Sequence, residues 1–294
     1  MTTWLSRTPS TAVPHVGASD RHPLKVARVA QQLRARPPGR PVSLKKRAVS
    51  HLVPKPADKR YTDAKIDLAE LDEILEVDPV ARTCTAEPGV TFSKLVTETL
   101  RYGLVPVVVP ELETITVGGA VSGCSLESTS FRYGGFHDSC LEYEVIAADG
   151  EVLRCTPEGE NALVFQMVHG SFGTLGVLSK LRFRLMLADP FVHVTYETYS
   201  TLASYKAAIW RRFVREDVDF MDGIIHSARE YVLCLGRFTK HAPYTSRYDW
   251  TKVYWQSTRR RGEDFLTTRD YFFRYDRGVT NVHPKSAVGR LLFG

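Results

Sequence analysis

One stretch of the chain consists of small residues that could let an anion reach the backbone. Residues 116–128, TVGGAVSGCSLES, hold three glycines and three serines. Adjacent glycines beside small residues allow successive N–H groups to point the same way and form an anion cradle at a helix start. The same composition would also suit a tight turn, in which Gly118, Gly119 and Gly123 let backbone segments touch. A second small-residue turn, GSFGTLG at 170–176, favours the phosphate-binding interpretation.

Two common nucleotide-binding fingerprints are missing from the chain. There is no GxGxxG after a first strand and no GxxxxGK[ST], so neither a standard Rossmann fold nor a P-loop is predicted. The cysteines show no CxxC spacing, which argues against a disulfide framework or a zinc site. We predict buried thiols at Cys84, Cys124, Cys140, Cys155 and Cys234.

The elements that must position the small-residue stretch are predicted from periodicity and turn residues. Strands and helices alternate through about residue 188. The glycine of the Asp149-Gly150 pair favours a two-residue hairpin turn with positive φ. The predicted elements are a helix at 24–36, two strands within 73–89 joined at Asp78-Pro79, a helix at 91–103 capped by Gly103, a strand at 104–110, a hairpin at 141–155, and a helix, glycine turn and long strand within 162–187.

The composition changes at Asp189-Pro190, which predicts a domain boundary near residue 189. Residues 1–20 are rich in Ser, Thr and Pro and are predicted to form a disordered tail. A first domain is expected over 21–189. Residues 190–294 are expected to form a second, α+β domain with an aromatic and basic surface.

Charge and hydropathy exclude several classes of protein. The net charge is +6, but the basic clusters are short and acidic residues lie between them, so no nucleic-acid partner is expected. No apolar run approaches the roughly 18 residues of a transmembrane segment. Because the N-terminus also lacks the features of a secretory signal, we predict a cytoplasmic protein.

Three longer segments carry a resemblance to a known family. PELETITVGGAVSGCSLESTSFRYG, YEVIAADGEVLRCTP and GSFGTLGVLSKLRF resemble the FAD-binding PCMH-type domain of the vanillyl-alcohol oxidase superfamily and, within it, the delta-24 sterol reductase (diminuto-like) family. The resemblance runs from about residue 37 to the end and includes RDYFFRYDRG and GRLLFG. It implies an α+β fold, with a two-subdomain FAD-binding domain over 21–189 and a partial substrate (cap) domain over 190–294.

The resemblance also implies which residues line the cofactor. Gly118 and Gly119 would donate backbone N–H groups to phosphate, and the serines of the block would add hydroxyl donors. The later turn would run beside the adenine–ribose and the flavin edge. The implied cofactor-binding residues are Thr116, Val117, Gly118, Gly119, Ser122, Gly123, Ser125, Glu127, Ser128, Gly173, Gly176 and Val177.

Two histidines could be mistaken for functional residues. The loop at 44–54 takes the place of the superfamily's first phosphate loop, where some relatives link a histidine covalently to the flavin. Around His51 the usual glycines are absent, so we expect FAD to bind without a covalent link. His137 is expected to be structural.

The resemblance implies a reaction but no catalytic acid. NADPH would reduce FAD, and the flavin would reduce a carbon–carbon double bond of a sterol-like or other lipid substrate, with a proton supplied to the adjacent carbon. Tyr275, Asp276, Arg274, Arg277 and His283 are either candidates for this step or a surface arginine–carboxylate network. The alternatives are a flavin oxidase or dehydrogenase of an alcohol or sugar, and a basic binding protein with a vestigial flavin site.

The end of the chain carries a further expectation. The family's second domain would continue past residue 294, whereas this chain stops at AVGRLLFG. We expect a shortened substrate domain, weak turnover, and aggregation or homo-oligomer formation through the exposed apolar end. Eukaryotic relatives carry an N-terminal membrane segment, which this sequence is not predicted to contain, so a sterol substrate is in doubt.

Overall fold

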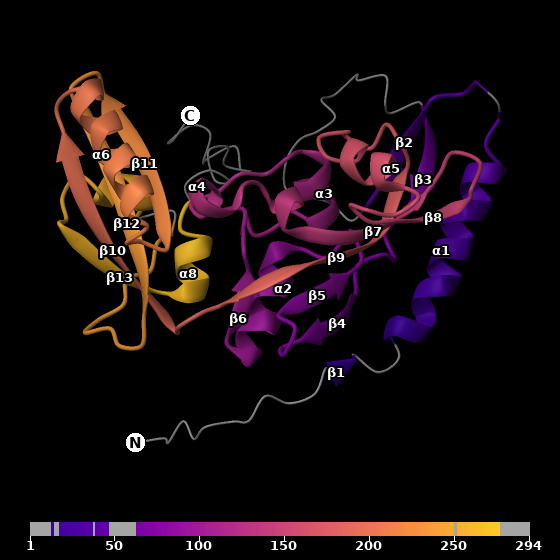
Figure 1. Cartoon of the computed structure of the whole chain (residues 1–294), viewed down its shortest axis with the longest axis horizontal. Helices are drawn as coiled ribbons and strands as arrows, with labels where there is room; N and C mark the ends of the chain where they lie inside the picture. Colours follow the sequence, from indigo (N-terminus) through magenta and orange to yellow (C-terminus); the bar gives the residue numbers. More distant parts are fainter. Residues whose placement is uncertain (1–12, 15–17, 38, 47–62, 250–251, 277–294) are drawn as a thin grey trace, which may run out of the picture. The chain divides into compact units, whose positions relative to one another are not determined.

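The computed structural model describes residues 13–14, 18–37, 39–46, 63–249 and 252–276, which form an α+β fold (Figure 1). The chain divides into two compact units. Unit 1 comprises residues 1–107, 114–125 and 136–186, and unit 2 comprises residues 108–113, 126–135 and 187–294. The predicted α+β class is confirmed. The small-residue block at 116–128 is divided between the units after Ser125.

Unit 1 is built on a seven-stranded sheet. Its strand order is β1 (Val13–Pro14), β4 (Ile74–Asp78), β5 (Thr83–Ala86), β9 (Val177–Leu187), β7 (Cys140–Ile146) and β8 (Val152–Cys155), and β6 (Leu104–Pro106) also pairs with β9. The central strand β9 buries alternate residues, including Leu181 and Phe183. Phe183 extends a core of aromatic rings in which Phe136 lies 5.1 Å from both Phe92 and Phe183.

Helix α1 (Ala18–Arg34) packs against the parallel strand pair β2 (Val42–Lys45) and β3 (Ala64–Asp67). Its apolar face, which includes Val26, Val29 and Leu33, meets Ile66 in one buried cluster. The helix begins six residues before the predicted start and contains Pro23. The prediction was wrong here because contacts made by His22, described below, hold the segment before the proline against the sheet.

Helix α2 (Phe92–Thr99) and strand β6 lead to the small-residue stretch. The Thr91 side chain caps the start of α2, and a short 3₁₀ turn (Leu100–Tyr102) ends at Gly103, which has φ +67°. This glycine is the predicted helix terminus. The rest of unit 1 contains α3 (Val117–Ser122), the 3₁₀ turn Phe136–Ser139 and α5 (Ala162–Met167).

The predicted hairpin between β7 and β8 is present, but its turn differs. The Ala147 N–H donates to the Glu151 carbonyl and the Gly150 N–H donates to the Ala147 carbonyl, so the turn spans more than two residues. Of the predicted pair, only Gly150 has positive φ, at +81°. The last strand pair is therefore Ile146 with Val152, whereas a two-residue turn at 149–150 would have made Ala148 and Glu151 the last pair.

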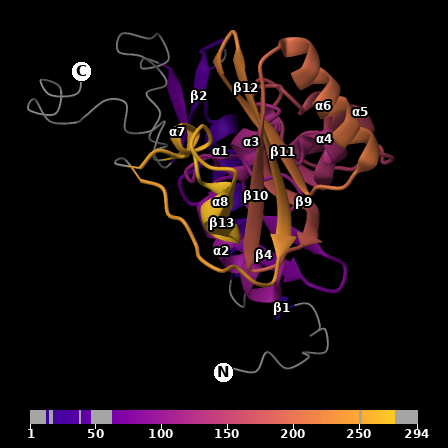
Figure 2. The same cartoon turned by 90° about the vertical axis from the view of Figure 1, so that its left-hand side faces the viewer.

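Unit 2 contains a four-stranded antiparallel sheet, seen in Figure 2. Its order is β11 (Phe220–Ser227), β12 (Glu230–Thr239), β10 (Phe191–Tyr199) and β13 (Glu263–Thr267). Helix α6 (Leu202–Arg215) packs on β10 and β12. The shorter helices are α4 (Ser130–Tyr133), α7 (Tyr254–Ser257) and α8 (Thr268–Phe272).

The cysteines of the chain are not paired in disulfides. All five cysteines are free thiols; four are buried, as predicted, and Cys124 is half-buried. Among the described residues no group of side chains is arranged to hold a metal ion. Within the same part of the chain, none of the helices combines the length and the apolar character that crossing a bilayer requires.

Candidate functional site

A cavity of about 290 Å³ in unit 1 brings the two glycine-rich turns together. Its walls come from the end of β2, the turn before α2, helix α3 and the turn that precedes β9. The lining residues are Leu44, Lys46, Leu68, Pro88, Gly89, Thr116, Gly118, Gly119, Ser122, Gly123, Phe172, Gly173, Gly176 and Leu178.

Seven of the twelve predicted cofactor-binding residues line this cavity, namely Thr116, Gly118, Gly119, Ser122, Gly123, Gly173 and Gly176. Val117 and Val177 are buried in the core instead. Ser125 is half-buried and lies outside the cavity lining. Glu127 and Ser128 belong to unit 2.

Gly118 serves close packing and does not offer its N–H group to an anion. That N–H donates to the Pro88 carbonyl at 3.0 Å. A Cβ atom at Gly118 would lie 2.6 Å from the Pro88 Cβ, so no larger residue fits. The expectation of a phosphate donor at Gly118 was wrong, because the backbone of residue 88 already takes this hydrogen bond.

Gly119 faces the cavity. Its N–H donates to Thr116 Oγ1 at 3.3 Å, a long bond made by the residue that caps α3. A Cβ atom built at Gly119 would meet only Thr116 Oγ1, at 3.2 Å, and Lys46 Nζ, at 3.9 Å. The missing side chain therefore leaves space directly in front of the Lys46 ammonium group.

Lys46 is the charged side chain among the described residues that line the cavity, and it was not among the predicted site residues. Desolvation by the surrounding walls lowers its pKa, although the side chain still reaches solvent. No carboxylate pairs with it among the described residues, whereas the neighbouring Lys45 binds Asp67 at 2.7 Å. An unpaired cation beside glycine-lined space is suited to binding phosphate. The basic run at 45–47, inside the expected phosphate loop, was the signal that could have identified it.

The turn at 170–176 is hydrogen-bonded to α3. The Gly170 N–H donates to the Val121 carbonyl and the Phe172 N–H donates to the Ser122 carbonyl. Gly173 and Gly176 have φ of +78° and +148°. A Cβ atom at Gly176 would lie 2.9 Å from the Ile146 carbonyl oxygen, so strand β7 requires glycine there. Phe172 is 82% exposed, so its ring is available at the cavity rim to stack on a planar ligand.

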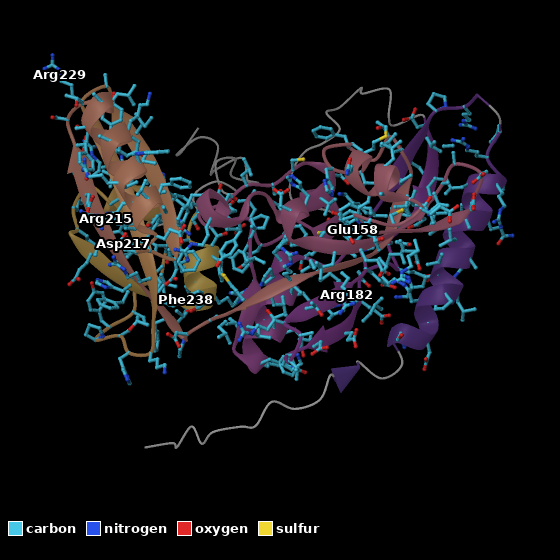
Figure 3. All side chains as sticks on the ribbon, in the orientation of Figure 1. Glu158, Arg182, Arg215, Asp217, Arg229 and Phe238 are labelled. Carbon is cyan, nitrogen blue, oxygen red and sulfur yellow. The ribbon has the colours of Figure 1, made fainter. Side chains whose placement is uncertain are left out.

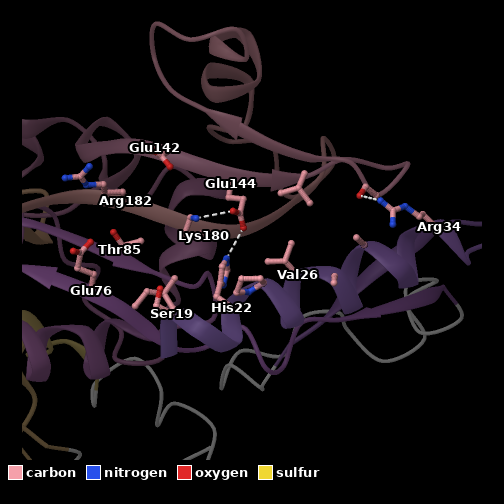
Figure 4. A pocket seen from close by; sticks show the side chains of 16 residues that line it. Ser19, His22, Val26, Arg34, Glu76, Thr85, Glu142, Glu144, Lys180 and Arg182 are labelled. Carbon is pink, nitrogen blue, oxygen red and sulfur yellow. Dashed lines mark hydrogen bonds and ion pairs between the residues drawn. The ribbon is translucent and has the colours of Figure 1, made fainter. Parts of the chain in front are cut away.

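A larger cavity of about 770 Å³ lies between α1 and the sheet (Figure 4). Its polar groups are largely bound to one another. The Glu144 carboxylate accepts hydrogen bonds from Lys180 and Ser179 and bonds to His22, and Arg34 donates to the Gly150 carbonyl. This cavity therefore has fewer free donors for a ligand than its size suggests, and we favour the smaller one.

The two histidines considered above fall in different places. His51 lies outside the described residues. His137 lies 4.9 Å from the ring of His169, which also meets Tyr143 and Phe165. The Tyr143 hydroxyl is 3.0 Å from His169 Nε2. His137, a residue of the 3₁₀ turn Phe136–Ser139, thus belongs to an aromatic cluster and is not part of the lining of the glycine-rich cavity.

The polar residues predicted near the end of the chain form a buried cluster in unit 2. The Arg274 guanidinium donates to Asp222 at 2.8 Å and lies 4.0 Å from the ring centre of Tyr271. The Tyr275 hydroxyl donates to the same carboxylate, and Asp276 accepts from the Glu113 N–H. Arg274 is only 4% exposed, so a surface network was the wrong description. Arg277 and His283 lie outside the described residues.

Two glutamates accompany this cluster. Glu127 accepts a hydrogen bond from the Glu111 N–H at 3.0 Å. Burial, reinforced by the charge of Glu111, raises the pKa of Glu127 to about 8. Burial also raises the pKa of Glu111. Glu127 was expected beside the cofactor; the structure groups it with the carboxylates of unit 2 and keeps it protonated near neutral pH.

The sequence is similar to FAD-binding proteins and to sterol reductases. Residues 47–156 match the FAD binding domain family, a segment that contains the whole small-residue block. The chain is 31% identical to Delta(24)-sterol reductase of Homo sapiens over 243 residues, which are 77% of this chain and 47% of the relative. It is 28% identical to Delta(24)-sterol reductase of Arabidopsis thaliana over 239 residues, 74% of this chain and 43% of the relative.

A more distant relative is Cytokinin dehydrogenase 8 of Oryza sativa subsp. indica, 27% identical over 140 residues, which are 47% of this chain and 26% of the relative. The chain spans about half the length of the curated sterol reductases it matches. The comparisons confirm the predicted resemblance: the chain carries an FAD-binding domain and is similar to the Delta(24)-sterol reductase family of FAD-binding PCMH-type oxidoreductases.

Proposed function

We propose that this protein is an FAD-dependent oxidoreductase that binds FAD without a covalent link in the glycine-rich cavity of unit 1. The observation that carries the proposal is the Lys46 ammonium group, which faces the space left by Gly119 and has no carboxylate partner among the residues that the structure describes. Gly119 lies within residues 47–156, the segment that matches an FAD-binding domain, and Lys46 directly precedes that segment.

The residues of the cavity fit part of a dinucleotide. Its volume of about 290 Å³ is near the lower end of the ~300–1,000 Å³ usual for small-molecule pockets. Lys46 would neutralise phosphate charge, the Ser122 hydroxyl would add a donor, and the exposed Phe172 ring would stack on a planar group. Gly118 and Gly176 act indirectly, because they let strands and turns approach closely enough to shape the walls.

Bound FAD would supply the capacity to move a hydride. The protein's part would be to fix the cofactor's position and neutralise its charge. By similarity to the sterol reductases, we propose reduction of a carbon–carbon double bond in a sterol-like or other lipid substrate, with NADPH as electron donor.

The cofactor assignment is tested by replacing Lys46. We expect Lys46→Met to release most of the flavin during gel filtration, because the phosphate would lose its cation. Lys46→Arg should retain it, since the charge is kept. Lys45→Met is the matched control, because the Lys45 ammonium group is held by Asp67.

Gly119→Leu tests the space in front of Lys46. Its side chain would fill that space, so we expect loss of flavin absorbance with little change in folding. Full flavin occupancy in both Lys46→Met and Gly119→Leu would contradict this site. Acid precipitation of the wild-type protein should release the yellow colour into the supernatant; colour in the pellet would contradict non-covalent binding.

A second candidate is a flavin dehydrogenase or oxidase of an alcohol or sugar. The similarity to a cytokinin dehydrogenase supports a dehydrogenase reaction, without pointing to either substrate. The two reactions are separated by anaerobic titration of the flavoprotein with NADPH and with NADH. Bleaching of the flavin by NADPH supports the reductase. Oxygen uptake with an alcohol or sugar, and no bleaching by NADPH, supports the alternative.

A further inference from the structure

Helix α6 of unit 2 has two faces of different character. One face packs on the four-stranded sheet, where Tyr205 and Ala208 join a buried cluster with Tyr231, Leu233 and Leu235. Arg212 lies on the same side and pairs with Glu197 and Asp217. These contacts fix how the helix is rotated about its axis. The opposite face is therefore determined by the helical period.

That opposite face is apolar and open to solvent. Trp210 is 65% exposed, Val214 63%, Leu202 51% and Phe213 43%. With 3.6 residues per turn, these four side chains and the exposed Ala203 and Ala207 occupy a continuous arc of about 140°. The rings of Trp210 and Phe213 lie 5.4 Å apart and form the centre of the arc. An exposed apolar surface of this kind indicates a binding partner.

The charges of α6 indicate which partner. The helix sequence, LASYKAAIWRRFVR, contains four basic residues and no acidic one. Lys206 projects within the apolar arc, while Arg211 and Arg215 follow its edge, and all three are exposed. Arg229 adds a further cation at the tip of the β11–β12 hairpin; Figure 3 labels it together with Arg215.

An apolar arc with tryptophan and phenylalanine, bordered by lysine and arginine, matches the chemistry of a membrane surface. Apolar side chains enter the boundary between headgroups and acyl chains, and long basic side chains extend to the phosphate level. Anionic lipid attracts such cations within a Debye length. A protein partner would need a carboxylate-rich apolar groove, whereas an anionic lipid surface offers both features along its whole extent.

We propose that the exposed face of α6 docks this protein on membranes that contain anionic lipid. Leu202, Trp210, Phe213 and Val214 insert into the interface, and Lys206, Arg211 and Arg215 contact the headgroups. This proposal rests on unit 2 alone and does not depend on flavin binding.

The test uses the whole chain and two kinds of vesicle, phosphatidylcholine alone and phosphatidylcholine mixed with phosphatidylserine. We expect co-flotation with the mixed vesicles, weakening as salt rises. Trp210→Ser with Phe213→Ser should abolish it. Lys206→Gln with Arg215→Gln should weaken it about thirty-fold, at the usual contribution of two basic residues near an anionic surface.

Trp255→Ser is the matched control, because Trp255 is an exposed tryptophan of the same unit outside α6. It should float as the wild type does. Absence of flotation with either vesicle, or flotation unchanged by both double variants, would overturn the proposal. So would a dimer that the Trp210/Phe213 variant dissociates in the absence of lipid binding, because a second copy would then cover the face. Circular dichroism of each variant checks that the fold is retained.

Discussion

A carboxyl group and an ammonium group are both shifted towards their neutral forms in this protein, for a shared reason. Lys46 loses water to the walls of the glycine-rich cavity, which lowers its pKa. Glu127 loses water within the cluster of unit 2 and also feels the charge of Glu111, and its pKa rises to about 8. When a desolvated carboxyl or ammonium group takes its charged form, the folded state becomes less stable, because the charge has lost its hydration. Such shifts are common at functional sites. The family resemblance had singled out Glu127, as a cofactor-binding residue, but not Lys46.

The shifted pKa of Glu127 predicts how stability depends on pH. Between the ordinary carboxyl value of 4.5 and about 8, the folded state holds a proton that the unfolded state releases, so stability falls as pH rises through this window. Arg274 opposes the shift, while Asp222 adds to it. We expect Glu127→Gln to remove this slope and to stabilise the protein by about 1 to 2 kcal/mol at neutral pH, after allowance for solvent access.

Thermal unfolding at a series of pH values between 5 and 8 measures this effect. Glu230→Gln is a suitable control, because Arg259 lowers the pKa of Glu230 and its titration falls below the window. An unchanged slope in Glu127→Gln would show that Glu127 is ionised in the folded protein.

Helix α1 shows how contacts between distant residues set the limits of an element. His22 bonds to Glu87 at 2.8 Å and to Glu144 at 2.9 Å, and Lys25 pairs with Glu73 and Glu87. These contacts hold the first turns of α1 against β7 and against the residues that precede β4 and follow β5. Figure 4 shows the contact between His22 and Glu144. The helix therefore continues through Pro23, although proline ordinarily marks a helix start.

The same contacts predict that α1 loosens at alkaline pH. Burial alone would lower the pKa of His22, but its bonds to Glu144 and Glu87 outweigh this and raise it. The stabilisation is present below the unfolded value of 6.5 and is lost as pH rises through the higher folded value. Glu144, whose pKa is held at about 2, and the neighbouring Lys25, whose pKa is raised by Glu73 and Glu87, stay charged throughout.

Hydrogen exchange of the α1 amides at two pH values on either side of this transition should reveal the loosening. We expect protection to fall by about 1 kcal/mol in the wild type and to be weaker but constant in His22→Gln. His241→Gln, an exposed histidine of unit 2, is the control. Equal protection of α1 at both pH values in the wild type would contradict a role for the charged imidazole.

The molecule as a whole consists of two units whose chain segments alternate along the sequence. Residues 108–113 and 126–135 belong to unit 2, although residues 114–125, which lie between them in sequence, belong to unit 1. The proposed flavin site belongs to unit 1, whereas the α6 face and the Arg274 cluster belong to unit 2. A ligand of one unit should therefore stabilise that unit first.

Added FAD should raise the melting temperature of the transition that unfolds unit 1. At a hundredfold excess over its dissociation constant, a ligand stabilises by about 2.7 kcal/mol, which corresponds to roughly 5–10 °C for a chain of this size. Riboflavin, which lacks the phosphates, should give a smaller shift at equal concentration, because it cannot use Lys46. Calorimetry with both ligands measures this, and equal shifts would argue against a phosphate contact at Lys46.

The local patterns of the sequence determined much of this protein. Alternating residues and turn signals were enough to predict the strands around Asp78-Pro79, the hairpin ending at Gly150 and the helix ending at Gly103, because these depend on neighbours along the chain. The order of the small-residue motifs was enough to predict the FAD-binding family.

Tertiary structure decided which groups are engaged and which are free. Only the fold shows that the Gly118 N–H already binds Pro88, that Lys46 faces Gly119, and that Glu127 lies beside Glu111. It also turns the apolar side of α6 outward. Each of these outcomes depends on contacts, burial and charge between residues distant in sequence, and periodicity and spacing carry no information about such pairings.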